Sequence, residues 1–120
     1  MSRVLIVDDN VEDAALLSRI LKDAKYEVSS TSCPKAALSL AQTERFDVVL
    51  LDNRFDQSSI IGLSAIQGFI NAAAAVIMMT AFGDSEIEKD AKMLGANAYL
   101  TKPVDSDILL RTIAQLVIKR

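Results

Sequence analysis

Five polar residues that could carry out chemistry each follow a run of apolar residues in this sequence. They are Asp8, Asp9, Asp52, Thr80 and Lys102. Their side chains are three carboxylates, a hydroxyl and an ammonium. A carboxylate can act as a nucleophile towards phosphorus, and an ammonium and a hydroxyl can bind phosphate oxygens. The set therefore predicts a site that accepts and holds a phosphoryl group.

The three carboxylates of this set also predict a metal site. Asp8, Asp9 and Asp52 carry like charges, which repel one another at close range unless they are neutralised or protonated. Lys102 supplies one positive charge, and a divalent cation would bring the local sum to zero. The ligands on offer are hard oxygen atoms, which favours Mg²⁺, with Mn²⁺ as the alternative, over zinc.

The elements that must position these residues alternate along the chain. Five short apolar runs predict strands, and three of them are nearly continuous and rich in β-branched residues, as in strands buried on both faces. The runs are Val4–Val7, Tyr26–Ser30 (the weakest), Val48–Leu51, Val76–Met79 and Ala98–Leu100. The stretches with helical spacing are residues 11–24, 34–43, 62–72, 84–94 and 105–119.

This alternation predicts a single α/β domain over residues 1–120. Strands joined by helices lie parallel, and helices cover both faces of the sheet, in the doubly wound (βα)5 arrangement. In an all-parallel sheet the carboxyl ends of all strands lie on one edge, where such folds bind their ligands. We therefore expect the five polar residues to converge there from four separate segments.

Several helix boundaries are marked by residues typical of those positions. Pro34 suits a first helical turn, and Ser85 and Glu88 have the spacing of a capping box. Gly95 suits the position just after a helix. An acidic residue at the start of the last helix, Asp105, matches the helix dipole.

Composition excludes several classes of function. The chain has 13 basic and 16 acidic residues, and its net charge of −3 argues against nucleic acid as a direct target. It contains no histidine, which excludes histidine catalysis and histidine metal sites on this chain. The one cysteine, Cys33, cannot form an internal disulfide, and the longest apolar run, Ala72–Met79, is too short to span a bilayer. We expect a soluble cytoplasmic protein with no membrane partner.

Four segments, in this order, resemble the receiver domain of bacterial two-component response regulators, including the chemotaxis regulators. They are Val4–Asn10, Val48–Asp52, Met79–Gly83 and Ala98–Pro103. Each segment alone is a weak signal, but each lies at the end of a predicted strand, and together they are specific. The resemblance covers the whole chain and implies a flavodoxin-like five-stranded sheet in the order 2-1-3-4-5.

The resemblance implies a role for each residue at the strand ends. Asp52 is the expected phosphoacceptor. Mg²⁺ is expected to bind Asp9, Asp52 and the backbone carbonyl of Arg54, with Asp8 helping directly or through water. Lys102 is expected to pair with the phosphoryl oxygens, and its bond to the following proline suits a cis form.

A conformational switch is also implied. Thr80 is expected to hydrogen-bond the phosphoryl group and Tyr99 to move between outward and inward positions, although either residue taken alone could serve packing instead. The side chains of Arg54 and Phe82 are expected to flank the phosphoryl group and tune how long it lasts. The readout is expected on the surface formed by residues 84–120. Such a domain changes its partner binding and is not an enzyme acting on a separate substrate.

The implied partners are proteins. The phosphoryl donor is a phosphohistidine on a sensor histidine kinase or phosphotransfer protein, and the signal passes to a downstream protein or a fused output domain. The apolar residues of 105–119 exceed one core-facing stripe. Contact with a partner, or a homodimer through residues 84–120, is therefore also expected.

The segment after Asp52 differs from the usual pattern of the family. Asp56 stands where the family usually has proline, and the first following glycine is Gly62. This difference keeps open a second hypothesis, a pseudo-receiver that serves only as a docking or dimerisation module. A third is a Mg²⁺-dependent phosphatase, although 120 residues leave little room for a substrate pocket. Taken alone, Asp8 and Asp9 could also simply cap the first helix.

Overall fold

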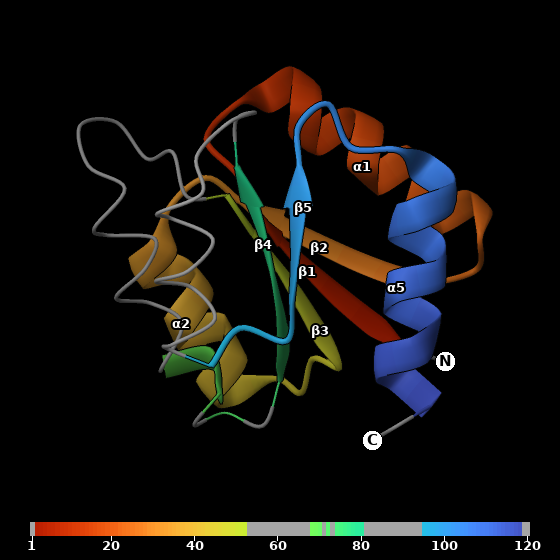
Figure 1. The fold of residues 1–120 in the computed structure, drawn as a ribbon. Helices are drawn as coiled ribbons and strands as arrows, with labels where there is room; N and C mark the ends of the chain where they lie inside the picture. Colours follow the sequence, from red (N-terminus) through yellow and green to blue (C-terminus); the bar gives the residue numbers. More distant parts are fainter. Residues whose placement is uncertain (1, 53–67, 71, 73, 81–94, 119–120) are drawn as a thin grey trace.

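The computed structural model describes residues 2–52, 68–70, 72, 74–80 and 95–118 of the chain (Figure 1). The side chains of Pro34, Thr80 and Ile118 lie outside this description. The elements in chain order are β1 (Arg3–Val7), α1 (Val11–Asp23), β2 (Glu27–Thr31), α2 (Pro34–Thr43), β3 (Val48–Asp52), β4 (Ala75–Thr80), β5 (Ala98–Thr101) and α5 (Ser106–Ile118).

The strands form one parallel sheet in the order β2-β1-β3-β4-β5, which confirms the predicted fold. β1 ends with Val7 opposite Leu51 of β3, and β3 ends with Asp52 opposite Met79 of β4. Parallel strands need crossover connections, which place helices on the faces of the sheet. Figure 1 shows α1 and α5 on one side of the sheet and α2, with the short helical segment at residues 68–70, on the other.

The central strands are buried on both faces because their side chains alternate between two cores. On β3, Val48 and Leu50 pack into the core that includes residues of α1 and α5. Val49 and Leu51 pack into the core that includes residues of α2. All four side chains are completely buried, and β1 and β4 show the same alternation. Two-sided burial therefore accounts for the nearly continuous apolar runs in the sequence.

The weakest predicted strand lies at the edge of the sheet. The run Tyr26–Ser30 predicts β2 one residue too early, since the strand extends from Glu27 to Thr31. β2 is partly exposed, and β1 is its neighbour in the described sheet. An edge strand does not need an apolar residue at every position, so its sequence pattern is less definite.

Capping side chains explain where two of the helices begin. Asn10 is the N-cap of α1, and its side-chain oxygen accepts a hydrogen bond from the Asp13 amide at 2.9 Å. Asn10, and not Asp8 or Asp9, therefore caps this helix. Asp105 accepts hydrogen bonds from the amides of the second and third residues of α5. Such caps satisfy amides that have no partner within the helix.

Two of the predicted helices fall wholly or partly beyond the part of the chain that is described. The predicted helix at 84–94, with its capping box, lies outside the described residues, and residues 68–70 represent the predicted helix at 62–72. Phe69, in this short segment, is completely buried. Gly95 has a φ of 105°, a left-handed conformation that glycine adopts without strain. Of the helices that are described, none has the length and apolar character to cross a membrane.

Arg3 lies where the strands begin, at the end of the sheet opposite to the predicted site, and ties several segments together there. Its guanidinium carbon lies 4.7 Å from the centroid of the Phe46 ring, and its side chain forms ion pairs with Glu27 and Glu44. Its backbone amide donates a hydrogen bond to the Asp47 carboxylate at 2.9 Å. One residue at the start of β1 thus joins the start of β2 to the segment between α2 and β3.

Candidate functional site

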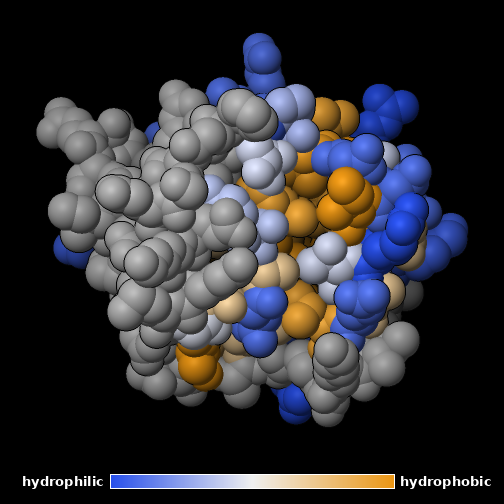
Figure 2. Space-filling view, in the orientation of Figure 1, coloured by the Kyte–Doolittle hydropathy of each residue, from blue (hydrophilic) through white to orange (hydrophobic). Residues whose placement is uncertain are grey.

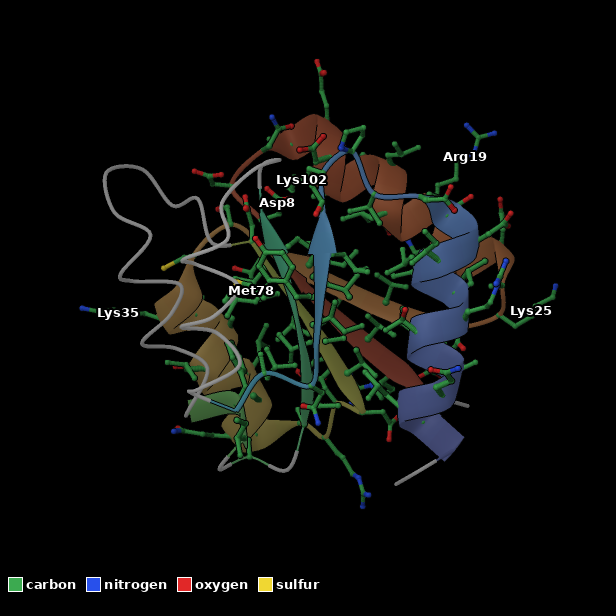
Figure 3. The ribbon with its side chains drawn as sticks, viewed as in Figure 1. Asp8, Arg19, Lys25, Lys35, Met78 and Lys102 are labelled. Carbon is green, nitrogen blue, oxygen red and sulfur yellow. The ribbon has the colours of Figure 1, made fainter. Side chains whose placement is uncertain are left out.

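The carboxyl ends of the strands bring the predicted site residues to one edge of the sheet. Asp8 directly follows β1, Asp52 is the last residue of β3, and Lys102 directly follows β5. Thr80 is the last residue of β4. Figure 3 shows Asp8 and Lys102 side by side at this edge, whereas Lys35 points away from the body of the domain.

Lys102 holds the acidic residues of this edge together. Its ammonium nitrogen lies 3.0 Å from a carboxylate oxygen of Asp8, 3.2 Å from one of Asp13 and 3.3 Å from one of Asp52. The side chains of Asp8 and Asp52 are 0% and 2% exposed. A buried charge without a partner carries a large desolvation penalty. The ion pairs with Lys102 offset this penalty for Asp8 and Asp52. The structure therefore places three predicted residues in direct contact.

The same contacts keep Lys102 charged. Burial by itself would lower the pKa of its ammonium, but the hydrogen bond to Asp8 and the charges of Asp52 and Asp8 outweigh that effect. The pKa therefore lies above its ordinary value of 10.5. Lys102 is a permanent cation at physiological pH, able to pair with an anion at this edge.

Asp8 is fixed in position from both of its carboxylate oxygens. One oxygen pairs with Lys102, and the other accepts a hydrogen bond from the Asn10 amide at 2.9 Å. The backbone amide of Asp8 donates to the carbonyl of Thr31, the last residue of β2, at 3.1 Å. The carboxylate is thus oriented before any ligand binds.

Asp13 joins this cluster, although the sequence pattern did not single it out. It lies in the first turn of α1, four residues after Asp9. The first turn of α1 begins two residues after Asp9, so Asp13 stays at the edge of the sheet where the strand-end pair lies. Glu12 is also acidic and lies in the same turn, so no signal in the sequence selects Asp13 as a partner of Lys102.

The carboxylates fit a small, hard cation. One oxygen each from Asp8, Asp9 and Asp52 can be chosen so that all three lie within 4.8 Å of one another, and Asp9 is exposed, so the group opens to solvent. Oxygen ligands at this spacing suit Mg²⁺, which also retains several water molecules. The backbone carbonyl of Arg54, the remaining predicted ligand, lies outside the described residues.

The local charge is more negative than the sequence indicates. With Asp13 included, the four carboxylates and one ammonium of this group carry a formal charge of −3. A divalent cation reduces this charge to −1 and does not neutralise it, which corrects the zero sum expected above. The excess negative charge strengthens the attraction for a cation.

The structure describes the predicted switch residues only in part. Tyr99 lies opposite Met78 in the pairing of β5 with β4, and it is partly buried against the core beneath α2. Thr80 is placed by its backbone at the end of β4. Arg54 and Phe82 lie outside the described residues. The peptide bond between Lys102 and the following proline is cis, as the sequence suggests.

The geometry of the edge agrees with comparisons to known proteins. The sequence model of the response regulator receiver domain family matches residues 4–114 of the chain. The chain belongs to this family. It is thus a receiver domain of the kind found in two-component signalling, and members of the family bind Mg²⁺ at an acidic pocket.

Curated relatives of this receiver domain include both long and short proteins. It is 33% identical over 111 residues to the transcriptional regulatory protein ZraR of Escherichia coli, covering 92% of the chain and 25% of ZraR. The chain therefore spans about a quarter of the length of that relative. It is 31% identical over 105 residues to the sporulation initiation phosphotransferase F of Bacillus subtilis, covering 88% of the chain and 85% of that protein.

Solved structures show the same fold. The chemotaxis protein CheY4 of Vibrio cholerae matches with a TM-score of 0.86 and 29% identity, over 97% of this chain and 98% of the other. A CheY-like receiver domain protein of Methanospirillum hungatei matches with a TM-score of 0.89 and 26% identity, over 99% and 95%. These matches agree with the strand order of this receiver domain.

Proposed function

We propose that this domain, taken as residues 1–120, is a phosphorylation-driven switch and that Asp52 is its phosphoacceptor. A carboxylate oxygen of Asp52 attacks the phosphorus of a phosphohistidine on a sensor histidine kinase or phosphotransfer protein. A new P–O bond forms as the P–N bond of the donor breaks, and the imidazole of the donor leaves. The observation that carries this proposal is the buried Asp52 carboxylate, with the Lys102 ammonium 3.3 Å away.

The neighbouring residues would support this transfer by charge and position. Asp8, Asp9, Asp52 and the backbone carbonyl of Arg54 would hold Mg²⁺, which when bound neutralises charge on the transferring phosphoryl oxygens. Lys102 donates hydrogen bonds to the same oxygens. Such chemistry needs positioning and charge neutralisation more than covalent help from the protein.

The phosphoryl group would then alter the surface of the domain. It adds a charge of about −1.5 to −2 and strong acceptor oxygens, which Thr80 and Lys102 can bond. Movement of Thr80 leaves space that Tyr99 can fill, while Arg54 and Phe82 flank the group and tune its lifetime. Because these contacts form only with the phosphoryl group, phosphorylation would shift the population of the domain towards the conformation that makes them.

The surface formed by residues 84–120 would carry the signal to a downstream protein, a fused output domain or a second copy of the chain. Figure 2 shows apolar side chains at the surface between β5 and α5, with hydrophilic side chains beside them. On α5, Leu109 and Ile113 are completely buried, whereas Ile108 is 51% exposed. Ile108 therefore lies outside the core-facing stripe of this helix and is available for contact with a partner.

The proposal is tested by intact mass spectrometry after incubation with Mg²⁺ and a small phosphodonor such as acetyl phosphate. We expect the wild-type chain to gain the mass of one phosphoryl group and Asp52→Asn to gain none. Asp23→Asn, the same change at an exposed position at the end of α1, is the control and should gain it normally. An equal gain in Asp52→Asn would overturn the assignment, and no gain in any chain would favour the docking-module alternative.

Mg²⁺ is expected to stabilise the fold because it binds the native carboxylate cluster and not the unfolded chain. At a hundred times its Kd, a ligand of this kind raises the free energy of unfolding by about 2.7 kcal/mol. Urea denaturation in MgCl₂, compared with NaCl of equal ionic strength, measures the effect. Asp9→Asn should lose most of it, whereas Asp23→Asn should retain it. Equal stabilisation of the two variants would contradict a metal site that includes Asp9.

A further inference from the structure

Asp13 has no part in the proposed phosphotransfer, yet it binds the same lysine. The Lys102 ammonium has three N–H donors, and the structure places carboxylates of Asp8, Asp13 and Asp52 within 3.3 Å of it. Three carboxylates can therefore account for all three donors. A phosphoryl oxygen can gain a hydrogen bond from Lys102 only if one of these contacts is given up or shared.

Burial indicates which contact Lys102 gives up. The Asp8 side chain is 0% exposed, so its release would leave a buried charge without this partner. Asp52 is itself the residue phosphorylated in the proposed reaction, so it carries the incoming group and is not the partner that the group displaces. The Asp13 side chain is 45% exposed on the first turn of α1, so water can replace the ammonium there at little penalty. Asp13 is therefore the partner that a phosphoryl group displaces.

We propose that Asp13 is a positioning residue that holds Lys102 in its unphosphorylated arrangement and so opposes phosphoryl binding at Asp52. This inference rests on the proposed function. Two effects act in the same direction. Asp13 competes with the phosphoryl oxygens for the ammonium, and its negative charge repels a dianionic group held by the same lysine.

The test is a titration with beryllofluoride, an anion that mimics a phosphoryl group on a carboxylate, at saturating Mg²⁺. Binding is followed through the backbone amide signals of Asp52 and Lys102 by NMR. We expect Asp13→Asn to bind beryllofluoride about three- to tenfold more tightly than wild type. The effect should have this size because the competing contact that is lost is charge-assisted but half-exposed. Asp13→Glu keeps the carboxylate and should restore affinity towards that of wild type.

A matched control is available one residue away. Glu12 is also acidic, exposed and in the first turn of α1, but it is not among the three carboxylates paired with Lys102 in the described part of the chain. Glu12→Gln therefore removes the same charge and the same interaction with the helix dipole. Its beryllofluoride affinity should stay close to that of wild type. An affinity for Asp13→Asn equal to that of Glu12→Gln would overturn the proposal.

The remaining outcomes separate this proposal from the one on which it rests. If Asp13 were merely structural, Asp13→Asn would lower the urea midpoint and leave the beryllofluoride affinity unchanged, which would overturn the positioning role alone. If the wild-type chain showed neither saturable beryllofluoride binding nor a phosphoryl mass gain, both proposals would fall together.

Discussion

Replacing Lys102 with methionine is expected to lower the free energy of unfolding by about 3–5 kcal/mol in buffer without divalent cations, the range for breaking a buried ion pair. Methionine keeps the length and apolar stem of the side chain but removes the ammonium. Asp8 and Asp52 then remain buried without the cation that lies 3.0 and 3.3 Å from them. Urea denaturation at neutral pH measures the loss.

Mg²⁺ should recover a large part of this loss because it can neutralise the same carboxylates. The stabilisation by Mg²⁺ should therefore be larger in Lys102→Met than in wild type. Lys35→Met is the control, since Lys35 is exposed on α2 and points away from the domain in Figure 3. A surface change of this kind alters stability by no more than about 0.5 kcal/mol. Equal losses for the two variants would show that the ion pairs of Lys102 do not hold this edge together.

Leu50→Ala is expected to lower the free energy of unfolding by about 3–5 kcal/mol, the range for large cavities in a core. Leu50 lies on the central strand β3, between Ile6 of β1 and Ile77 of β4, and all three side chains are completely buried. Strands fixed by pairing on both sides cannot move inward to fill the cavity, so little of the loss should be recovered by relaxation.

The matched variant for this test is Leu16→Ala. Leu16 is 58% exposed on α1, so the same chemical change removes little buried surface there. Alanine also has the highest helix propensity, which offsets part of any lost contact. The difference between the two variants, measured by urea denaturation, reports the burial of Leu50. A loss for Leu50→Ala as small as that for Leu16→Ala would contradict the two-sided core.

The sheet was predictable because a strand that is buried on both faces needs an apolar residue at nearly every position. β1, β3 and β4 contain almost only apolar residues, and a polar residue marks the end of each, as Asp52 marks the end of β3. Parallel strands then place these residues at one edge without further information. The contacts of Lys102 with Asp8 and Asp52 follow from this topology, although their distances do not.

Other features were not predictable, for identifiable reasons. Acidic residues are common in the first turn of any helix because they interact with its dipole, so nothing in the sequence distinguishes Asp13 from Glu12. Only the tertiary structure shows that Asp13 reaches Lys102. The bounds of β2 were misplaced by one residue because an edge strand tolerates polar residues. The roles of Thr80 and Tyr99 stay predictions, since they depend on a phosphorylated state.

The ionic groups at the two ends of β1 can be engineered separately. Arg3 with its acidic partners lies at one end, and Asp8 with Lys102 lies at the other, about 16 Å away at the rise of a strand. Substitutions separated by this distance and sharing no partners change stability additively. The Arg3 end therefore offers a place to raise thermal tolerance for crystallography or biosensor design while the chemistry around Asp52 is left as it is.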